Sequence, residues 1–234
     1  MNHKLLPVVI LLCVLITITF YRNWIAMRNL PRFTLLNMNG CSILNTSTEL
    51  EEQQMLYAHV KACDRVLQLG GNIGTSCITV DKLLSENGRS HNVCVEPSNI
   101  VLPTLQKNKD INNAKFTILH GILTKSDKEL RLAEHGENLN ASTITESEGS
   151  IVNKFVFSEL NDHHKFNVIF ADCEGCFPSF IDEFKDEFQH VETIIYEKDY
   201  ESSKDYVSME KTLKDLQFRH IVHGFVNVWK RSRT

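Results

Sequence analysis

The sequence predicts an α/β domain with a mostly parallel β-sheet, closed by a C-terminal antiparallel hairpin and preceded by one transmembrane helix. Three observations predict this fold class. Apolar runs rich in Val, Ile and Leu recur along the chain without the polar alternation of half-exposed strands. Helix-length segments separate several of these runs, which is typical of a parallel sheet covered on both faces. An uncharged stretch near the N-terminus predicts the membrane helix.

Residues 1–22 are the predicted transmembrane anchor. Leu5–Phe20 carries no charge, and Tyr21 and Trp24 follow as aromatic residues of the kind found at membrane interfaces. A cleaved signal peptide is the alternative, but bulky residues stand where a small-x-small cleavage site would be needed. We therefore expect a single-pass membrane protein.

The side of the membrane on which the domain lies stays open. Arg22, Arg28 and Arg32 follow the apolar stretch and favour a cytoplasmic domain. Two Asn-x-Ser tripeptides, at Asn45 and Asn140, are potential glycosylation acceptors and would suit a lumenal domain.

A stalk or linker is predicted over residues 23–49, and the folded domain over residues 50–234. Five strands are expected in the sheet: Arg65–Leu69, Asn92–Val95, Lys115–Leu119, Asn167–Ala171 and Thr193–Tyr196. Three helices are expected between them, Gly74–Glu86, Asn99–Asn108 and Phe177–Phe188, and a fourth, Lys204–Leu216, after the fifth strand. Phe218–Val222 and Phe225–Lys230, joined by the turn-like pair His223-Gly224, form the closing hairpin.

Composition and charge exclude some classes of partner. The net charge of −4 provides no basic stripe for nucleic acid, which is therefore not an expected partner. Six cysteines follow the apolar N-terminal stretch. Their even number permits disulfides, but Cys77 and Cys94 lie in expected core elements, where a thiol behaves as a small apolar group, and we favour free thiols.

A glycine-rich turn follows the first predicted strand in VLQLGGNIGTS. Gly70, Gly71 and Gly74 allow a sharp turn and a close approach of the backbone to a ligand, with Asn72 between them. The helix that starts near Thr75 offers unpaired N–H groups. The spacing matches neither the dinucleotide G-x-G-x-x-G pattern nor a P-loop, and it suits a ligand whose amino-acid tail lies on the loop.

The second predicted strand ends in VCVEPSN, twenty-two residues after Gly74. A carboxylate at the tip of this strand is placed to accept both hydroxyl groups of an adenosine ribose. Glu96 is therefore the expected ribose ligand, and Pro97 and Ser98 are expected beside the same ligand. An exposed glutamate at a strand end, without a ligand, is the alternative.

From about Arg65 to Trp229 the sequence resembles the FkbM-like methyltransferase family. The ordered pieces are VLQLGGNIGTS, VCVEPSN, ADCEG, IIYEKD and a closing strand near GFVNVW. The resemblance implies a Rossmann-like methyltransferase fold, S-adenosylmethionine as the cofactor, and methylation of a hydroxyl group on a sugar or small molecule. The first motif of the family usually begins with an acidic residue, and Gln68 stands there in this sequence. Gln68 can still accept a hydrogen bond from the cofactor's ammonium group.

The carboxylates that follow the later strands are the candidate catalytic residues. Methylation of a hydroxyl group needs a base or a metal. We expect Asp172 to contact the methionine part of the cofactor or the acceptor hydroxyl, and Glu174 to act there or to shape the loop. Glu197 is a candidate for orienting the acceptor, and His120 for the adenine edge. Purely structural roles are the alternative for Asp172 and Glu174, and a surface histidine without a ligand is the alternative for His120.

Two other readings compete with the enzyme. The chain could be a membrane-anchored binding protein without catalysis, because Gln68 replaces an acidic residue. Cys173 and Cys176 also have the C-x-x-C spacing of a thiol oxidoreductase, although such motifs usually stand near the start of a domain. No second pair of cysteines or histidines with ligand spacing accompanies them, so no metal site is expected.

Overall fold

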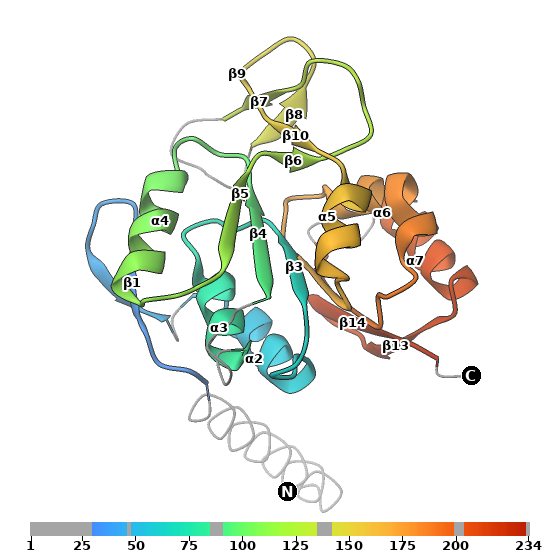
Figure 1. The fold of residues 1–234 in the computed structure, drawn as a ribbon, viewed down its shortest axis with the longest axis horizontal. Coiled ribbons are helices and arrows are strands. Elements are labelled where there is room, and N and C mark those ends of the chain that lie inside the picture. Colours follow the sequence, from blue (N-terminus) through green and yellow to red (C-terminus); the bar gives the residue numbers. More distant parts are fainter. Residues whose placement is uncertain (1–29, 46–47, 85–90, 135–141, 199–203, 233–234) are drawn as a thin grey trace, which may run out of the picture.

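The computed structural model describes residues 30–45, 48–84, 91–134, 142–198 and 204–232. Its centre is a seven-stranded sheet in the order β13-β14-β12-β11-β3-β4-β5 (Figure 1). The pairs from β5 to β12 are parallel, whereas β14 is antiparallel to both β12 and β13. This is the mostly parallel sheet with a C-terminal antiparallel hairpin that the sequence predicts, and that prediction is confirmed.

The observed strands lie within two residues of the predicted ones. They are β3 (Val66–Leu69), β4 (Asn92–Glu96), β5 (Thr117–His120), β11 (Val168–Ala171), β12 (Thr193–Glu197), β13 (Phe218–Val222) and β14 (Val226–Arg231). The helices are α2 (Leu50–His59), α3 (Thr75–Leu84), α4 (Leu102–Ile111), α5 (Phe157–His164), α6 (Phe177–Phe184) and α7 (Lys204–Asp215), with a 3-10 turn, η4, at Lys185–Glu187.

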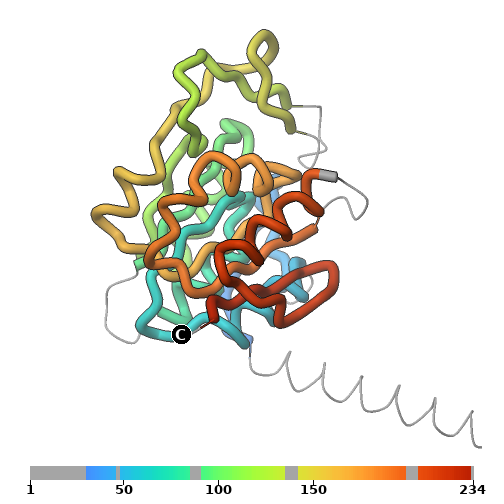
Figure 2. The backbone as a smooth tube through the Cα atoms, turned by 90° about the vertical axis from the view of Figure 1, so that its right-hand side faces the viewer, coloured from blue at the N-terminus to red at the C-terminus, as the bar shows by residue number. Residues whose placement is uncertain are grey.

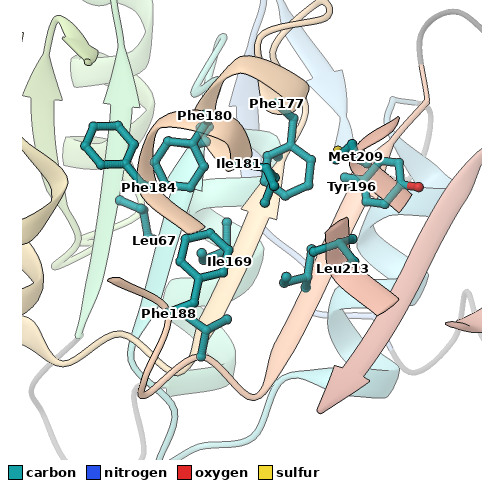
Figure 3. Close-up of a cluster of buried hydrophobic side chains, with 14 of the residues drawn as sticks. Leu67, Ile169, Phe177, Phe180, Ile181, Phe184, Phe188, Tyr196, Met209 and Leu213 are labelled. Atoms are coloured by element: carbon teal, nitrogen blue, oxygen red, sulfur yellow. The ribbon is translucent and has the colours of Figure 1, made fainter. Parts of the chain in front are cut away.

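One face of the sheet packs on α5, α6 and α7 through a continuous apolar core (Figure 3). Helix α6 shows why the helices pack there, since its apolar residues recur at i, i+3, i+4 and i+7: Phe177, Phe180, Ile181 and Phe184. All four are buried, and the ring of Phe157 from α5 lies 5.3 Å from that of Phe180. Burial of each such ring contributes roughly 1.5–3 kcal/mol to folding.

The opposite face packs on α2, α3 and α4, and it encloses polar side chains as well as apolar ones. Gln53 donates to the carbonyl oxygens of Asn45 (2.6 Å) and Thr48 (2.7 Å). Asn108 bonds to Leu36 and, at 2.8 Å, to the carbonyl oxygen of Ile73 in the glycine-rich turn. Because buried amides must be paired, these bonds fix where the loops at this face run.

A small sheet lies above the carboxyl ends of the central strands (Figures 1 and 2). It consists of β7 (Arg131–Ala133) between β8 (Thr143–Thr145) and β9 (Ser150–Ile151). A parallel pair, β6 (Ile122–Leu123) with β10 (Lys154–Phe155), connects it to the domain. The long connection between β5 and α5 thereby covers the edge of the sheet where parallel strands bind ligands.

The predicted stalk is corrected in its second half. A hairpin of β1 (Thr34–Leu36) and β2 (Ser42–Leu44) packs on α4, and Leu35 is fully buried between them. Asn112 of α4 donates to the carbonyl oxygen of Thr34 at 2.7 Å. Residues 30–45 therefore belong to the folded domain, because they bury apolar surface and pair their backbone with it.

The predicted transmembrane anchor at residues 1–22 lies outside the described residues. Among the helices that the structure describes, none combines the length and the apolar character needed to cross a bilayer.

Candidate functional site

A pocket of about 470 Å³ opens at the carboxyl ends of β3, β4 and β11. Its lower side is formed by Leu69, Gly70 and Asn72 after β3, by Glu96, Pro97 and Ser98 after β4, and by residues 172–176 after β11. Its upper side is formed by residues 121–124, by Leu130 and Leu132, and by residues 142–144 of the small sheet. Ser179, Phe180 and Glu183 of α6 close one end. The pocket therefore lies between the sheet edge and its cover.

The glycine-rich turn comes into backbone contact with the loop after β11. Gly70 has a φ of 89°, and a Cβ atom added there would lie 1.7 Å from the carbonyl oxygen of Asp172. No side chain fits in that space, so the residue type is fixed by this contact as well as by the left-handed backbone. Asn72 also has positive φ, 44°, and its buried Oδ1 atom has no hydrogen-bond partner among the residues that the structure describes.

Glu96 ties the two loops on either side of it together. Its Oε2 atom accepts hydrogen bonds from the amides of Gly71 (3.0 Å) and Asn72 (2.8 Å), and its Oε1 atom accepts one from the amide of Ser98 (2.8 Å). Burial raises the pKa of Glu96, while the three amides and nearby His120 act in the opposite direction. A carboxylate accepts about four hydrogen bonds, so roughly one position stays open for a ligand.

The structure gathers most of the predicted site residues around this pocket. Its lining includes Gly70, Asn72, Glu96, Pro97, Ser98, Asp172 and Glu174. Gly71, Gly74 and Thr75 belong to the same turn and helix start without lining the pocket. His120 and Glu197 also lie outside the lining, His120 at the end of β5 and Glu197 at the end of β12.

Gln68 is placed differently from the expectation. Its side chain is fully buried on the face of the sheet that carries α2 and α3, and it donates to Asn92 at 2.7 Å. Asn92 in turn donates to the carbonyl oxygen of Cys77 in α3. Side chains alternate between the two faces of a strand, so Gln68 lies on the opposite face from its pocket-lining neighbour Leu69. We therefore correct its expected contact with a cofactor.

The loop after β11 contains a disulfide between Cys173 and Cys176, whereas the sequence favours free thiols. Both cysteines line the pocket. Between them, Glu174 is exposed and has a φ of 51°, and Gly175 has a φ of 84°. Two successive left-handed residues bring the cysteines together, which spacing alone does not predict. Cys77 and Cys94 are buried and free, as expected.

Sequence reasoning missed Glu183, which lies on the inner side of α6. Its carboxylate accepts hydrogen bonds from the hydroxyl of Thr124 (3.0 Å) and the amide of Lys125 (2.5 Å). Both Thr124 and Glu183 line the pocket. The available signal was an acidic residue one turn after Phe180 and directly before Phe184, but helices commonly carry such residues on their solvent side.

A second missed residue, Glu49, lies at the N-terminal end of α2 in the predicted linker. Its pKa is raised from 4.5 to about 8 by burial and by the carboxylates of Asp172 and Glu52. Hydrogen bonds from the Ser76 amide and the Thr75 hydroxyl at the start of α3 act in the opposite direction. Glu49 therefore brings a further acidic group close to the glycine-rich turn and to Asp172.

The described part of the chain contains no cluster of three or more His, Cys, Asp or Glu side chains that could hold a metal ion.

Comparison with known proteins gives similarity in structure only. No family model and no curated protein match the sequence. A protein of the NADB-Rossmann superfamily from Streptococcus agalactiae superposes with a TM-score of 0.51 at 13% identity, over 79% of this chain and 69% of its own. A Streptococcus pneumoniae protein described as a tRNA (m1A22) methyltransferase, in complex with S-adenosyl-L-methionine, gives 0.47 at 11% identity, over 79% and 73%.

The O-methyltransferase from Bacillus cereus, in complex with SAH, gives a TM-score of 0.46 at 15% identity, over 79% of this chain and 82% of its own. Identities this low show the fold alone. The strand order and the first of these superpositions together show that the chain has a Rossmann-like fold with a mostly parallel central sheet.

Proposed function

We propose that this protein is an S-adenosylmethionine-dependent methyltransferase that transfers a methyl group to a hydroxyl oxygen. The arrangement of Glu96 carries the proposal. A buried carboxylate at the tip of the second strand, held by the amides of the glycine-rich turn, offers its remaining acceptor position to the pocket. This is the place where Rossmann-like folds hold the ribose of a nucleoside.

The residues present fit S-adenosylmethionine. Glu96 and Ser98 would hold the ribose, and the turn at Gly70 and Asn72 would carry the amino-acid part, toward which the unpaired Oδ1 atom of Asn72 could accept a hydrogen bond. Apolar residues of the small sheet, such as Leu132, would cover the adenine. When bound, the cofactor supplies a methyl group on a sulfonium centre.

Asp172 is the proposed general base. It lines the pocket, is partly buried, and lies at the carboxyl end of the central strand β11. Its carboxylate would take the proton of the acceptor hydroxyl as the oxygen is methylated. Glu183, which is held by Thr124 and Lys125, would orient the acceptor at the other end of the pocket. Glu174 is exposed between the cysteines and would contact a bound acceptor.

The experiment that tests the proposal is calorimetric titration of the full chain, in detergent, with S-adenosylmethionine and S-adenosylhomocysteine. Saturable binding by the wild type, lost in Glu96→Ala and retained in Glu148→Ala, is the expected result, since Glu148 is exposed on the small sheet. No binding by the folded wild type would refute the proposal. Binding followed by no methyl transfer to hydroxylated sugars, lipids or tRNA would favour the non-catalytic binding protein.

One observation favours a second candidate function, thiol–disulfide exchange. Cys173 and Cys176 form a disulfide, and Cys176 is exposed directly before α6. Reduced thiols at this place would be oxidised by a disulfide substrate, with two electrons and two protons passing to that substrate. Reduction of insulin disulfides by the reduced protein, lost in Cys176→Ser, would support this function, and the absence of any exchange would reject it.

We also propose that residues 1–22 anchor the domain in a membrane and that the domain faces the oxidising side. The uncharged stretch supports the anchor, and the Cys173–Cys176 disulfide supports the side, because such bonds persist in oxidising compartments. Protection of the domain from protease added to intact microsomes is the expected result. Digestion without detergent would place it on the cytoplasmic side, as the arginines after the stretch favour.

A further inference from the structure

The charged residues that line the pocket are all acidic. They are Glu96, Asp172, Glu174 and Glu183, and the lining contains no lysine, arginine or histidine of the described residues. Glu96 and Asp172 follow strands of the central sheet and lie beside the glycine-rich turn, where the proposed cofactor would bind. Glu183 lies at the end of the pocket that α6 closes. In the proposed function this carboxylate therefore faces the acceptor.

The Glu183 carboxylate is held in one position by the segment that follows β6. The hydroxyl group of Thr124 lies 3.2 Å and 3.0 Å from its two oxygen atoms, and the amide of Lys125 donates to Oε2 at 2.5 Å. Thr124 is itself buried, at 7% exposure. Both donors are uncharged, and they leave about two of the roughly four acceptor positions of a carboxylate for a ligand.

Lys125 does not neutralise this carboxylate. Its ammonium group is directed to the Glu187 carboxylate at 2.6 Å and to the backbone carbonyl oxygen of Glu183 at 2.7 Å. Glu187 thereby matches the charge of the lysine, and the Glu183 side chain has only neutral donors among the residues that the structure describes. Because a charge inside a protein is stabilised by pairing with an opposite charge, a cationic group of the ligand would complete the site.

The walls of the pocket near Glu183 are apolar. Phe180, one turn before Glu183 on α6, is 4% exposed. Leu123 of β6 packs against the same apolar core as Phe180, and Leu130 and Ile144 belong to the upper side of the pocket. Such walls stabilise a hydrocarbon group that leaves water. A sugar would lose the hydration of its hydroxyl groups there without gaining partners for them.

We propose that the acceptor of this pocket is a hydroxylated organic amine with an apolar middle. Its ammonium group binds Glu183, its hydroxyl group faces Asp172, and its apolar middle lies against Phe180 and Leu123. The inference rests on the proposed function, in which Asp172 removes the hydroxyl proton, and it names the substrate class of the same pocket. Phosphorylated acceptors, nucleic acid included, are disfavoured because the acidic lining repels phosphate.

The test compares probes that differ in the charge of one end, on the full chain in detergent with saturating S-adenosylhomocysteine. Tyramine carries an ammonium group, para-ethylphenol is neutral, and para-hydroxyphenylpropionate carries a carboxylate. Aminohexanol and hexanol repeat the comparison without an aromatic ring. Calorimetry should show that the wild type binds each amine at least about tenfold more tightly than its neutral partner. The carboxylate probe should bind most weakly.

Glu183→Gln is the variant, because it removes the charge and nearly keeps the size of the side chain. It should weaken both amines about tenfold and leave the neutral probes and S-adenosylhomocysteine unchanged. Asp182→Asn, at an exposed carboxylate on the same helix, is the matched control and should change none of the affinities. Equal weakening of the amines by the two variants would mean that the general charge of α6 attracts them, and it would overturn the role of Glu183.

The position of the transferred methyl group gives an independent measurement. Mass spectrometry of tyramine after turnover with S-adenosylmethionine should place the methyl group on the phenol oxygen. A methyl group on the nitrogen would mean that the amine, rather than the hydroxyl group, faces Asp172, and it would overturn the orientation that Glu183 imposes.

The outcomes separate this inference from the proposed function. Equal affinity of the wild type for amines and neutral probes, tighter binding of the carboxylate probe, or binding of none of these probes by a protein that binds S-adenosylhomocysteine overturns the inference while cofactor binding stands. A wild type that does not bind S-adenosylhomocysteine refutes the proposed function itself. Thermal unfolding establishes that Glu183→Gln is folded, and the comparison of probes on the wild type does not depend on that variant.

Discussion

The face of the central sheet under α5, α6 and α7 is filled by aromatic rings, whereas the face under α2, α3 and α4 encloses amide and hydroxyl groups. On the first face, the ring of Phe157 lies within 6.3 Å of four other phenylalanine rings, those of Phe166, Phe180, Phe184 and Phe188. On the second, Gln53, Asn92 and Asn108 are almost completely buried and hydrogen-bonded.

The aromatic face and the polar face contribute differently to the fold: the first mainly to its stability, the second mainly to its exact geometry. Apolar contact is nondirectional and supplies most of the free energy of folding. A buried hydrogen bond contributes less net energy, but it holds for one geometry only. The polar face lies beneath the glycine-rich turn. The position of the turn is therefore fixed by hydrogen bonds, which form in one geometry only. We therefore expect changes on the aromatic face to alter mainly stability, and changes on the polar face to alter ligand binding as well.

Phe157→Ala should have the largest effect on stability. Phe157 is fully buried, and its truncation leaves a cavity that costs about 3–5 kcal/mol of unfolding free energy. Urea denaturation measures the loss. The control Phe225→Ala, at a side chain 49% exposed, should cost under about 0.5 kcal/mol. Folded Phe157→Ala protein with strongly weakened S-adenosylhomocysteine binding would break the proposed separation of roles.

Asn108→Leu tests the polar face. The change leaves Leu36 and the carbonyl oxygen of Ile73 without their partners, which should cost about 2–3 kcal/mol. Because Ile73 belongs to the glycine-rich turn, affinity for S-adenosylhomocysteine should also fall several-fold. Lys107→Ala, exposed on the same helix, is the control. A loss of stability with unchanged affinity would show that the turn does not depend on this bond.

The pH dependence of stability tests the acidic end of the polar face. The pKa of Glu49 is about 8 in the folded chain and 4.5 when unperturbed. Unfolding therefore releases a proton between these values, so the free energy of unfolding falls as pH rises from about 5 to 8. Glu49→Gln should be more stable than the wild type at pH 8, by up to about 4 kcal/mol, and equal to it near pH 4.5. Parallel pH profiles for the two proteins would contradict the raised pKa.

Reduction of the disulfide should have the smallest effect on stability. Cys173 and Cys176 close a very short loop, so breaking the bond should cost about 1 kcal/mol. Since both cysteines line the pocket, reduction should change the ligand affinity clearly. The melting temperature should change only slightly. Calorimetry with and without dithiothreitol measures both quantities. Cys41→Ser, at an exposed free thiol, is the control.

The sequence predicts the strands well because burial leaves a strong local signal. A run such as Val168–Ala171 is apolar at every position, which is the pattern of a short strand buried on both faces. The pocket residues Gly70, Glu96 and Asp172 follow from the same reasoning, because parallel strands bring their carboxyl ends to one edge. Positions at strand ends could therefore be predicted without knowledge of the tertiary contacts.

Gln68 and Glu49 could not be placed in this way. Gln68 and Leu69 are adjacent in the sequence motif, which suggests that both contact the same ligand. In a strand, however, the side chains of adjacent residues lie on opposite faces of the sheet. Glu49 lies in a segment of mixed polarity whose strands are only three residues long, and only packing on α4 and α3 reveals that the segment is folded. The Cys173–Cys176 bond likewise depends on two left-handed residues that the sequence does not signal.

The neighbouring position of β3 and β11 has a consequence for how the protein is made. The amide of Arg65, just before β3, donates to Asn167, 102 residues later, just before β11. A ribosome must therefore synthesise roughly the first three quarters of the chain before the central strand gains its second neighbour and Gly70 meets Asp172. Until then β3 presents an open edge. The pocket therefore cannot assemble before the nascent chain has been synthesised through Glu183, the last residue of its lining.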